Sequence, residues 1–399
     1  MSIRQIVIVC FEDPRRVSGG VQRRVAAEIE YFSKCGVGVT VITEGLGGTR
    51  NEESAQFITI PTPGVIYPLR SLIFAARAGQ LLRHLPQGDV IEAHHDAGGA
   101  VLFAFPFRRS DRNVFVEVVH GVFRDEFAAI RQHEKSFSRA GLVASGLLPL
   151  SVMEQAAAHR ATAVVTVSQY SAGQIVRHYG VPRSRIHVIS NGISAESYTP
   201  MARPVSKNAN GATFLLYVGR LNARKGVLQL LQAFALARHS YPSLQLKFVG
   251  DGPLAPNLWE MCVHLGLEGV VEFLGIVTDK EVLKAYQSAD IVCIPSLQEG
   301  QGIVALEAQA CGVPVVASRA TGLLEVVRDR QTGLLVPPGD IQALSEAILE
   351  LARSPLLRQE LGHNAARWAR SFTWENMLSP CLPLYEKLSI SALETQQSN

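Results

Sequence analysis

The sequence predicts an α/β protein with two doubly wound domains, each built on a parallel sheet. Short strand-like apolar runs alternate with segments of helical apolar spacing along almost the whole chain, as in βαβ units. The alternation stops over 193–211, where Ser, Pro, Asn and Gly accumulate, and then restarts. A length of 399 residues also exceeds one ordinary domain. We expect a first domain over 1–192, a linker over 193–211 and a second domain over 212–375. A C-terminal helix with a frayed tail, over 376–399, is expected to pack back toward the first domain.

The first half opens with a strand and a helix. The run QIVIVC is strand-like, and the following helix places Val21, Val25, Ile29 and Phe32 on one face before it ends at Gly36. Further strand runs, each ending in polar or small residues, are VGVTVIT, DVIEAHH, NVFVEVVHG and AVVTVS. Strands that alternate with helices in this way favour parallel pairing.

The second half repeats the pattern after the linker. Its strand-like runs are TFLLYVG, LQLKFVG, VVEFLG, DIVCIPS, VPVVAS and TGLLVPPGD. Its helical segments are GVLQLLQAFALARHS, APNLWEMCVHLG, DKEVLKAYQSA, GIVALEAQACG, DIQALSEAILELARS and ENMLSPCLPLYEKLSIS. Ligands of such sheets bind beyond the carboxyl ends of the strands. The residues directly after each strand are therefore the candidate site residues.

Composition narrows the class of protein. The chain is 47% hydrophobic and 18% charged, which is typical of a globular protein, and its net charge of +3 gives no indication of a nucleic-acid partner. The six cysteines are scattered without paired or zinc-like spacing. The apolar run at the N-terminus leads straight into a loop, unlike a signal peptide, and no run reaches the length of a membrane span. We expect a cytoplasmic protein, with peripheral contact to the inner face of a membrane left open.

The turn GRLNARKGV, after the first strand of the second half, carries two cations. Arg220 and Lys225 lie five residues apart between Gly219 and Gly226, just before a helix. Two cations beside exposed backbone N–H groups suit a phosphate or diphosphate. A solvated loop with two charges is the alternative for such a pair in isolation. The position at the mouth of the sheet favours anion binding.

The stretch EGQGIVALE places two carboxylates on either side of a helix start. Glu299 lies in the loop after a strand, and Glu307 lies about one turn into the helix. Gly302, Ile303 and Val304 are expected at the first turn, where N–H groups face outward. A first-turn glutamate that stabilises the helix dipole is the structural alternative for Glu307. A carboxylate accepts two hydroxyl hydrogen bonds, so the pair suits a polyhydroxylated ligand such as a nucleotide sugar.

Histidines follow two strands of the first half. His120 comes directly after a strand, at the predicted mouth of the sheet, which favours a site role over a purely structural one. His94, His95 and Asp96 follow another strand and raise the question of a metal. Adjacent histidines point apart, and no third ligand is spaced to complete a site, so no metal is expected.

The motifs together resemble a known family. The segments EGQGIVALEAQACGVPVVAS, YVGRLNARKGV, VVTVSQYSAGQIVRHYGVPRSRIHVISNGI and SGGVQRRV are similar to the retaining glycosyltransferases of family 4, also called glycosyl transferases group 1. Glu-x7-Glu combined with Arg-x4-Lys is the specific part of the resemblance, which spans nearly the whole chain. It implies the GT-B fold, in which two Rossmann-like domains face each other across a cleft and the second holds a nucleotide diphosphate-sugar.

The resemblance also implies roles for individual residues. Arg220 and Lys225 would hold the diphosphate, Glu307 the ribose hydroxyls and Glu299 the ring hydroxyls of the transferred sugar. Gly302, Ile303 and Val304, together with Gly219, would supply backbone contacts to the donor. In the first domain, Gly19 and Gly20 would let the backbone approach the diphosphate and acceptor, and His120 would approach the donor sugar. His120, Glu299, Arg220 and Lys225 are thus the expected catalytic set.

Two positions depart from the family pattern. The family usually has Phe where this chain has Gln301 and Met where it has Gln309, so no role is carried over to Gln301. Asp251 and Glu325 also follow strands. For each, the sequence supports a turn or capping role as well as it supports a position in the binding site.

The implied reaction transfers a hexosyl unit from a UDP- or GDP-sugar to a hydroxyl acceptor with retention and without a metal or other cofactor. Retention through a carboxylate nucleophile would need an acid on the opposite face of the sugar, and no residue of the sequence is indicated for that role. The resemblance implies instead that the acceptor is delivered to the face that the phosphate leaves, and that the departing phosphate takes its proton. Negative charge on the departing diphosphate would be stabilised by the cations and the N–H donors. The expected setting is cell-envelope polysaccharide, glycolipid or glycoside synthesis.

The acceptor is less well indicated. The segment Tyr67–Leu85 has helical apolar spacing with arginines between, which suits either a helix packed on the sheet or a basic helix at a membrane with a lipid-linked acceptor. The segment 123–160 is long enough to form an acceptor wall. A sugar-nucleotide epimerase or a phosphorylase of the same fold, and a non-catalytic nucleotide-sugar-binding protein, stay open as alternatives. A dinucleotide oxidoreductase is excluded because no G-x-G-x-x-G follows the first strand.

Overall fold

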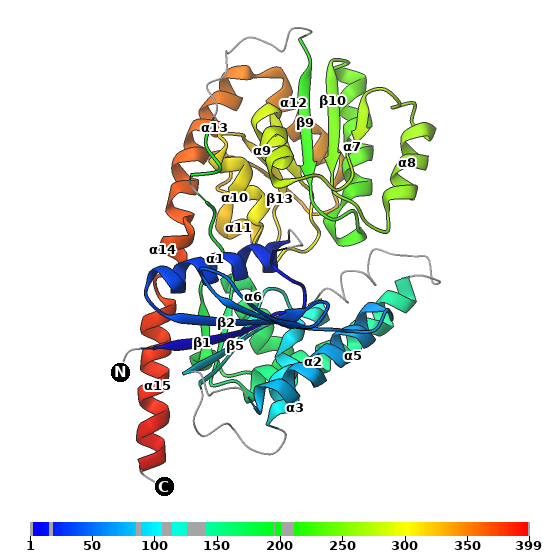
Figure 1. Cartoon of the computed structure of the whole chain (residues 1–399). Helices are drawn as coiled ribbons and strands as arrows, with labels where there is room; N and C mark the ends of the chain where they lie inside the picture. Colours follow the sequence, from blue (N-terminus) through cyan, green and yellow to red (C-terminus); the bar gives the residue numbers. More distant parts are fainter. Residues whose placement is uncertain are drawn as a thin grey trace. The chain divides into compact units, whose positions relative to one another are not determined.

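The protein consists of two compact units. The computed structural model describes residues 3–15, 19–84, 89–105, 114–125, 140–194, 196–200 and 211–397. The first unit contains the described residues up to Asn191 together with those from Trp374 onward, and the second runs from Gly192 to Thr373. Each unit is a twisted sheet with helices packed against it (Figure 1).

The sheet of the first unit has the strand order β3-β4-β2-β1-β5-β6-β7-β8 among the described residues. Its strands are β1 Gln5–Val9, β2 Gly38–Glu44, β3 Gly48–Asn51, β4 Gln56–Ile60, β5 Val90–His94, β6 Val114–Val119, β7 Ala163–Thr166 and β8 Ile186–Val188. Every neighbouring pair is parallel except β3 with β4. Strands β5, β6 and β7 are buried along their whole length, which explains why their sequences are nearly continuous apolar runs.

Helices cover this sheet, and one of them comes from the C-terminal end of the chain. The described helices are α1 Gly20–Lys34, α2 Tyr67–Leu82, α3 Gly99–Ala104, α5 Ala140–Arg160, α6 Gln169–Gln174, α14 Trp374–Leu378 and α15 Cys381–Gln397. Short 3-10 or π turns occupy His95–Gly98, Ile175–Tyr179 and Arg183–Arg185. Cys381 and Tyr385 of α15 are fully buried in the same core as Phe32 of α1. The last helix is therefore an integral part of the first unit.

The second unit has the parallel strand order β11-β10-β9-β12-β13-β14. Its strands are β9 Thr213–Val218, β10 Leu244–Val249, β11 Val271–Phe273, β12 Ile291–Ile294, β13 Val315–Ser318 and β14 Gly333–Val336. Its helices are α7 Val227–Ser240, α8 Ala255–His264, α9 Asp279–Ser288, α10 Ile303–Ala310, α11 Leu323–Val326, α12 Ile341–Arg353 and α13 Pro355–Ala369. The strand order reverses between β9 and β12, and a ligand is expected at such a reversal.

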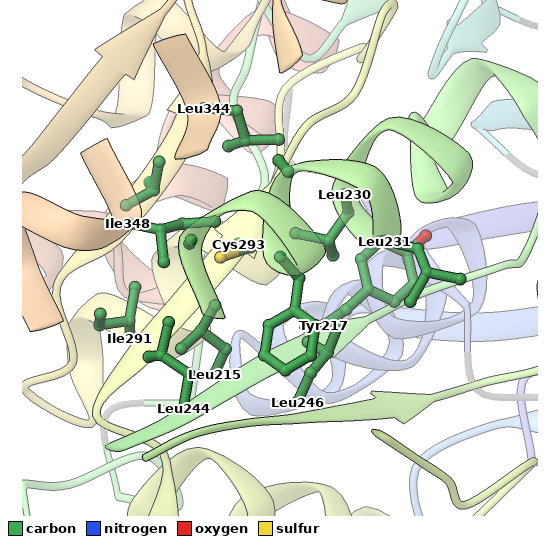
Figure 2. Close-up of a cluster of buried hydrophobic side chains, with 14 of the residues drawn as sticks. Leu215, Tyr217, Leu230, Leu231, Leu244, Leu246, Ile291, Cys293, Leu344 and Ile348 are labelled. Atoms are coloured by element: carbon green, nitrogen blue, oxygen red, sulfur yellow. The ribbon is translucent and has the colours of Figure 1, made fainter. Parts of the chain in front are cut away.

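The period-2 alternation of each strand divides the core of the second unit into two faces. Figure 2 shows one face, where Leu215 and Tyr217 of β9 and Leu244 and Leu246 of β10 meet α7 and α12. The intervening residues, such as Leu216, belong to the core on the opposite face of the sheet. Both faces are apolar, as a fully covered parallel sheet requires.

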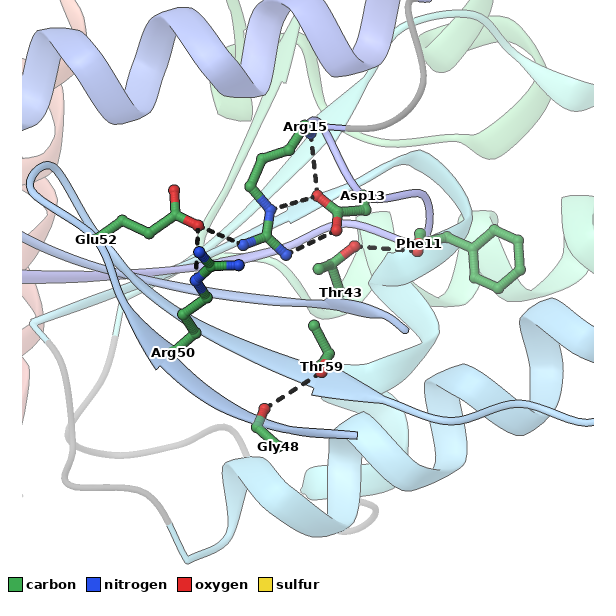
Figure 3. Close-up of polar contacts among 8 residues, drawn as sticks. All are labelled: Phe11, Asp13, Arg15, Thr43, Gly48, Arg50, Glu52 and Thr59. Carbon is green, nitrogen blue, oxygen red and sulfur yellow. Dashed lines mark hydrogen bonds and ion pairs between the residues drawn. The ribbon is translucent and has the colours of Figure 1, made fainter. Parts of the chain in front are cut away.

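A polar network holds the edge of the first sheet (Figure 3). Arg15 donates to Asp13 at 2.9 Å and 2.7 Å and to Glu52 at 2.6 Å, and it lies over the ring of Phe57. A hollow of about 350 Å³ lies at this edge, lined in part by Arg15, Arg50 and Glu52. Glu52 pairs with both arginines and Asp13 pairs with Arg15, so two carboxylates balance the two guanidinium groups at this edge.

Three details differ from what the sequence led us to expect. The edge strands β3 and β4 and the short β8 were not anticipated, because they lack a long apolar run. The last helical segment is two helices, with the interruption at Pro380. The tail expected to be frayed continues α15 as far as Gln397, consistent with its Ala, Leu, Glu and Gln, which are good helix formers. Residue 195 and residues 201–210 of the expected linker lie outside the described residues.

Candidate donor site

The turn that joins β9 to α7 is held very close to the end of β12. Gly219 and Gly226 have φ values of +147° and +66°, which favour glycine. A β-carbon added to Gly226 would lie 2.1 Å from the carbonyl oxygen of Pro295. The two glycines therefore let the cationic turn fold tightly at the mouth of the sheet. The sequence predicted this location for the turn.

The two predicted cations differ in their surroundings. Arg220 is exposed, and among the described residues its guanidinium has no hydrogen-bond or ion-pair partner. Lys225 donates to a carboxylate oxygen of Glu299 at 2.5 Å, and both side chains are mostly buried. The structure therefore brings Lys225 and Glu299 together as expected for one site, and it leaves Arg220 accessible to an anion.

The Glu299 carboxylate has further partners that the sequence did not reveal. Ser296 donates its hydroxyl to the same carboxylate oxygen at 3.2 Å, and Arg224 donates to the carbonyl of Gln298 at 3.3 Å. Burial raises the pKa of Glu299, but Lys225 and Arg224 outweigh burial, so the pKa lies below its usual value. Glu299 is thus an ionised acceptor at neutral pH.

Thr321 fixes the backbone of the Glu299 loop. Its hydroxyl accepts a hydrogen bond from Glu299 N at 2.9 Å, and the next residue, Gly322, donates its N–H to Glu299 O at 3.1 Å. Thr321 has φ of +53°, an unfavourable conformation for a β-branched residue. The only sequence signal for Thr321 and Ser296 was their place directly after a strand, since β13 ends at Ser318 and β12 at Ile294.

The start of α10 faces the same strand ends. Gly302 is the N-cap with φ of +100°, and Ile303 and Val304 form the first turn, whose N–H groups have no acceptor within the helix. Glu307 lies one turn further on and is only 1% exposed. Its carboxylate accepts a hydrogen bond from the hydroxyl of Tyr286 at 2.9 Å. The sequence did not indicate Tyr286, which comes from α9.

The glutamines at the two departures from the family pattern are both buried. Gln309 donates to the carbonyl of Ala305 at 3.1 Å and to that of Val326 at 3.0 Å, so it ties α10 to α11. Asp251 has a turn role, because its carboxylate accepts from Gly252 N at 2.7 Å. Glu325 lies in the first turn of α11.

In the first unit, His120 follows β6 directly and contacts a second histidine. Its Nε2 lies 3.0 Å from Nδ1 of His94, and the two rings stack with centroids 5.3 Å apart. Gly19 is the N-cap of α1 and Gly20 its first residue, and a β-carbon on Gly20 would meet nothing within 4 Å. The space that would let the backbone approach a ligand is therefore present at Gly20.

The expectation that His94 lacks companions with ligand-type side chains is wrong. His94 and His95 do point apart, since His95 pairs with Glu154 at 2.9 Å. However, His94 Nε2 lies 3.1 Å from Glu28 and 3.3 Å from Glu92, and these three ligand-type atoms lie within 4.8 Å of one another. Spacing could not reveal this group, because Glu28 comes from α1, 66 residues before His94 in the sequence.

These carboxylates already have positive partners. Arg24 donates to Glu28 at 2.5 Å, and an imidazolium at His94 supplies the second positive charge against Glu28 and Glu92. Burial raises the pKa of Glu28, but Arg24 and His94 outweigh burial and lower it, whereas burial and Glu28 raise the pKa of Glu92. Positive groups already face both carboxyl groups. We therefore interpret the group as an ion-pair network. Asp96, the third polar residue of this segment, accepts from the hydroxyls of Tyr67 at 2.8 Å and Ser71 at 2.9 Å.

The arginines of the segment 67–85 are engaged within the protein. Arg70 pairs with Glu44, Arg77 donates to the carbonyl of Pro61, and Arg83 donates to the carbonyl of Ala104. The helix that carries the first two is packed through Phe74, Ala75 and Ala78. These contacts favour a helix packed on the sheet over one committed to a membrane. Residues 126–139 of the expected acceptor wall lie outside the described residues.

Two family models match the chain. The model for Glycosyltransferase Family 4 matches residues 18–197, and the model for Glycosyl transferases group 1 matches residues 199–368. Between them they take in the motifs of both units. The chain belongs to the family 4 glycosyltransferases of the GT-B fold. The resemblance seen in the sequence is thereby confirmed.

Relatives of this glycosyltransferase include two proteins named D-inositol 3-phosphate glycosyltransferase. The one from Saccharomonospora viridis is 32% identical over 59% of this chain and 57% of its own length, so the match spans little more than half of that protein. The one from Corynebacterium urealyticum is 27% identical over 93% of this chain and 91% of its own length.

Solved structures of similar fold confirm the architecture of the glycosyltransferase. Sucrose-phosphate synthase from Thermosynechococcus elongatus superposes with a TM-score of 0.81 at 22% identity, over 97% of this chain and 100% of its own. Anabaena HepE, solved in complex with UDP-glucose, gives 0.69 at 21% identity, over 99% and 100%. In the described part of the chain, no helix has the length and apolar character required to cross a membrane.

Proposed function

We propose that this glycosyltransferase moves a hexosyl unit from a UDP- or GDP-sugar to a hydroxyl acceptor, with retention of configuration and without a metal. The observation that carries the proposal is the Lys225–Glu299 pair beside Arg220 and the start of α10. Cations and a carboxylate rarely gather at the reversal point of a parallel sheet without a ligand that carries both phosphate and hydroxyl groups.

Each donor-site residue has a role that suits its environment. Exposed Arg220 and the ammonium of Lys225 would bind the diphosphate, with backbone N–H groups of Gly302 to Val304 directed at the same anion. Glu299, held as a carboxylate, would accept hydrogen bonds from the ring hydroxyls of the sugar. Glu307 would accept from the ribose hydroxyls, oriented by Tyr286.

The chemistry follows from these charges. The bond between the anomeric carbon and the β-phosphate oxygen breaks, and both electrons leave with the phosphate. Arg220, Lys225 and the N–H donors stabilise that negative charge in fixed positions. The acceptor oxygen bonds to the anomeric carbon on the face that the phosphate leaves, and its proton passes to the departing phosphate. For His120, Gly19 and Gly20 in the first unit we propose contacts with the substrates.

The setting proposed for the reaction is cytoplasmic synthesis of an envelope polysaccharide, glycolipid or glycoside. Support comes from the free state of the six cysteines, five of which are buried. A lipid-linked acceptor would reach the first unit from a membrane surface. The apolar side chains Ile66, Leu69 and Leu72 at the start of α2, which are 70%, 46% and 42% exposed, support that route.

The test is a binding and hydrolysis panel of UDP-, GDP- and ADP-sugars, followed by Glu299→Ala. We expect one donor to bind and to release its nucleoside diphosphate faster when an acceptor is added, and Glu299→Ala to reduce transfer by at least tenfold (about 1.4 kcal/mol). Glu272→Ala, an exposed glutamate on β11, is the matched control. Absence of binding by every donor, or full transfer by Glu299→Ala, contradicts the proposal.

A further inference from the structure

A buried cluster of charged side chains contacts His120 from within the first unit. Arg24 and Glu28 of α1 and Glu92 and His94 of β5 all have side chains that are 0% exposed. Nε2 of His94 lies 3.1 Å from Oε2 of Glu28 and 3.3 Å from Oε1 of Glu92. The reaction proposed above uses none of these four residues.

The remaining oxygens of the two carboxylates are held from separate elements. Oε1 of Glu28 accepts from Nε of Arg24 at 2.5 Å, and Arg24 also donates to the carbonyl of Ile189 at 2.7 Å. Oε2 of Glu92 accepts from the hydroxyl of Tyr385 on α15 at 2.9 Å. The carboxylates therefore cannot turn away from His94 without breaking contacts to α1 or α15.

His94 connects this cluster to His120. A hydrogen bond between Nδ1 of His94 and Nε2 of His120, 3.0 Å apart, needs one proton between the two nitrogens. Two carboxylates at Nε2 favour the doubly protonated form of His94, whose Nδ1–H then donates to His120. In that arrangement Nε2 of His120 is an acceptor, so the proton of a neutral His120 lies on Nδ1.

We propose that Glu28, Glu92 and His94 are positioning residues that hold His120 as a neutral imidazole with its proton on Nδ1. His120 then offers a substrate hydroxyl or phosphate oxygen a hydrogen-bond donor, and it is prevented from acting as a general base through Nε2. The consequence for transfer rests on the proposed function, whereas the tautomer rests on the cluster alone.

The charges around the two histidines act in the same direction. Burial lowers the pKa of His94, but Glu28 and Glu92 outweigh burial and raise it. Burial and Glu28 raise the pKa of Glu92, whereas burial of Glu28 is outweighed by Arg24 and His94, which lower its pKa, so Glu28 is the stronger negative partner of His94. Burial and the positive charge of His94 both lower the pKa of His120. Other titratable or charged groups also act on the two histidines or on Glu28 and Glu92. They are Cys10 directly after β1, Arg24 of α1, His95 after β5, and Cys381 and Tyr385 of α15. Burial raises the pKa of Cys10, Cys381 and Tyr385, so these three are neutral near pH 7.

The first experiment uses the native full chain labelled with ¹⁵N-histidine. Two-dimensional ¹H–¹⁵N spectra of the imidazole rings report which nitrogen carries the proton, and His120→Gln assigns the His120 signals. We expect protonated Nδ1 and unprotonated Nε2 at His120, and two protonated nitrogens at His94, across neutral pH. An imidazolium at His120, or a proton on its Nε2, overturns the proposal.

The second experiment compares Glu28→Gln with Glu117→Gln in the same spectra. Glu117 is a buried carboxyl on β6, three residues before His120, and burial raises its pKa, so its amide variant is the matched control. Glu28→Gln should release the second proton of His94 and let the pKa of His120 rise, because the positive neighbour is lost. Glu117→Gln should leave both histidines as in the native chain. Unchanged histidine signals in folded Glu28→Gln also overturn the proposal.

Transfer activity separates this inference from the function itself. With a donor that the panel shows to bind, Glu28→Gln should lower transfer by roughly tenfold and shift its pH profile, while donor affinity changes less than twofold. If no donor binds, the proposed function is contradicted, but the result on the tautomer of His120 is unaffected. If a donor binds but His120 carries its proton on Nε2, only the present inference is contradicted.

Discussion

Lys225 and Glu299 lie 74 residues apart in the sequence, and their side chains form an ion pair at 2.5 Å. The exposed fractions of the two side chains are 16% and 15%. The pair joins the turn after β9 to the loop after β12, at the reversal point of the sheet. Because each side chain holds the other in place, a ligand that binds here contacts both residues in fixed positions.

The first prediction concerns the pH dependence of stability. The folded pKa of Glu299 lies below the ordinary value of 4.5, so the carboxylate stabilises the fold above that value and loses its effect as pH falls through the folded pKa. We expect Glu299→Gln to be less stable than the native chain by about 1–3 kcal/mol near pH 7, and the difference to be smaller near pH 3. Urea unfolding at both pH values measures this. An equal difference at both values contradicts it.

A second prediction isolates the hydroxyl of Thr321. Thr321→Ala removes the acceptor of the Glu299 N–H bond and keeps the unfavourable φ of +53°. We expect Thr321→Ala to weaken binding of the donor nucleotide sugar by roughly 5–10-fold, about 1 kcal/mol, measured by calorimetry. Thr321→Ser restores the hydroxyl and should bind like the native chain. Equal affinities of the two variants would rule out a positioning role.

A third prediction separates steric contact from backbone strain at Gly226. Gly226 and Gly266 have similar φ values, +66° and +63°, but only at Gly226 would a β-carbon meet another atom, 2.1 Å from Pro295 O. Gly266→Ala should cost about 1–2 kcal/mol of unfolding free energy through strain alone. Gly226→Ala should cost at least about 3 kcal/mol, because the loop after β12 must also shift. Chemical denaturation of both variants tests the difference, and similar losses would show that the close approach is unimportant.

A fourth prediction compares two tyrosines with the same contact. Tyr286 donates to Glu307 and Tyr385 to Glu92, each at 2.9 Å and each to a buried carboxyl. Both phenylalanine variants should lose about 1–3 kcal/mol of stability. Only Tyr286→Phe should also weaken nucleotide binding, by about threefold to tenfold, if Glu307 binds the ribose. Parallel titrations with UDP and GDP decide this, and an equal effect of both variants argues against the ribose role.

The sequence was sufficient to predict two doubly wound domains, each built on a parallel sheet. Strand runs such as QIVIVC and DIVCIPS are apolar because helices cover both faces of each sheet, and this gives a strong signal. Short edge elements gave a weak signal, so β3 and β4 were missed. The C-terminal helices belong to the first unit through contacts such as Tyr385 with Glu92, which are 293 residues apart and have no local signature.

The candidate site was predictable only where a motif occupies a strand end. Arg220, Lys225, Glu299 and His120 lie in the segments that follow strands, so topology together with the family resemblance drew attention to them. Partners such as Ser296, Thr321 and Tyr286 are common residue types whose roles depend on three-dimensional contacts. The same holds for Glu28, a helical glutamate on an amphipathic helix, where an exposed position is the ordinary expectation.

The most direct test of the central claim is calorimetric titration of the native chain and of Arg220→Ala with UDP and GDP. Arg220 is exposed and has no hydrogen-bond or ion-pair partner among the described residues, so its removal should leave the fold intact. We expect the native chain to bind at least one nucleotide and Arg220→Ala to bind it roughly 10–150-fold more weakly, the value of a charge-assisted hydrogen bond to phosphate. Absence of binding by the native chain, or equal affinity of folded Arg220→Ala, would contradict a nucleotide-sugar site at the end of β9.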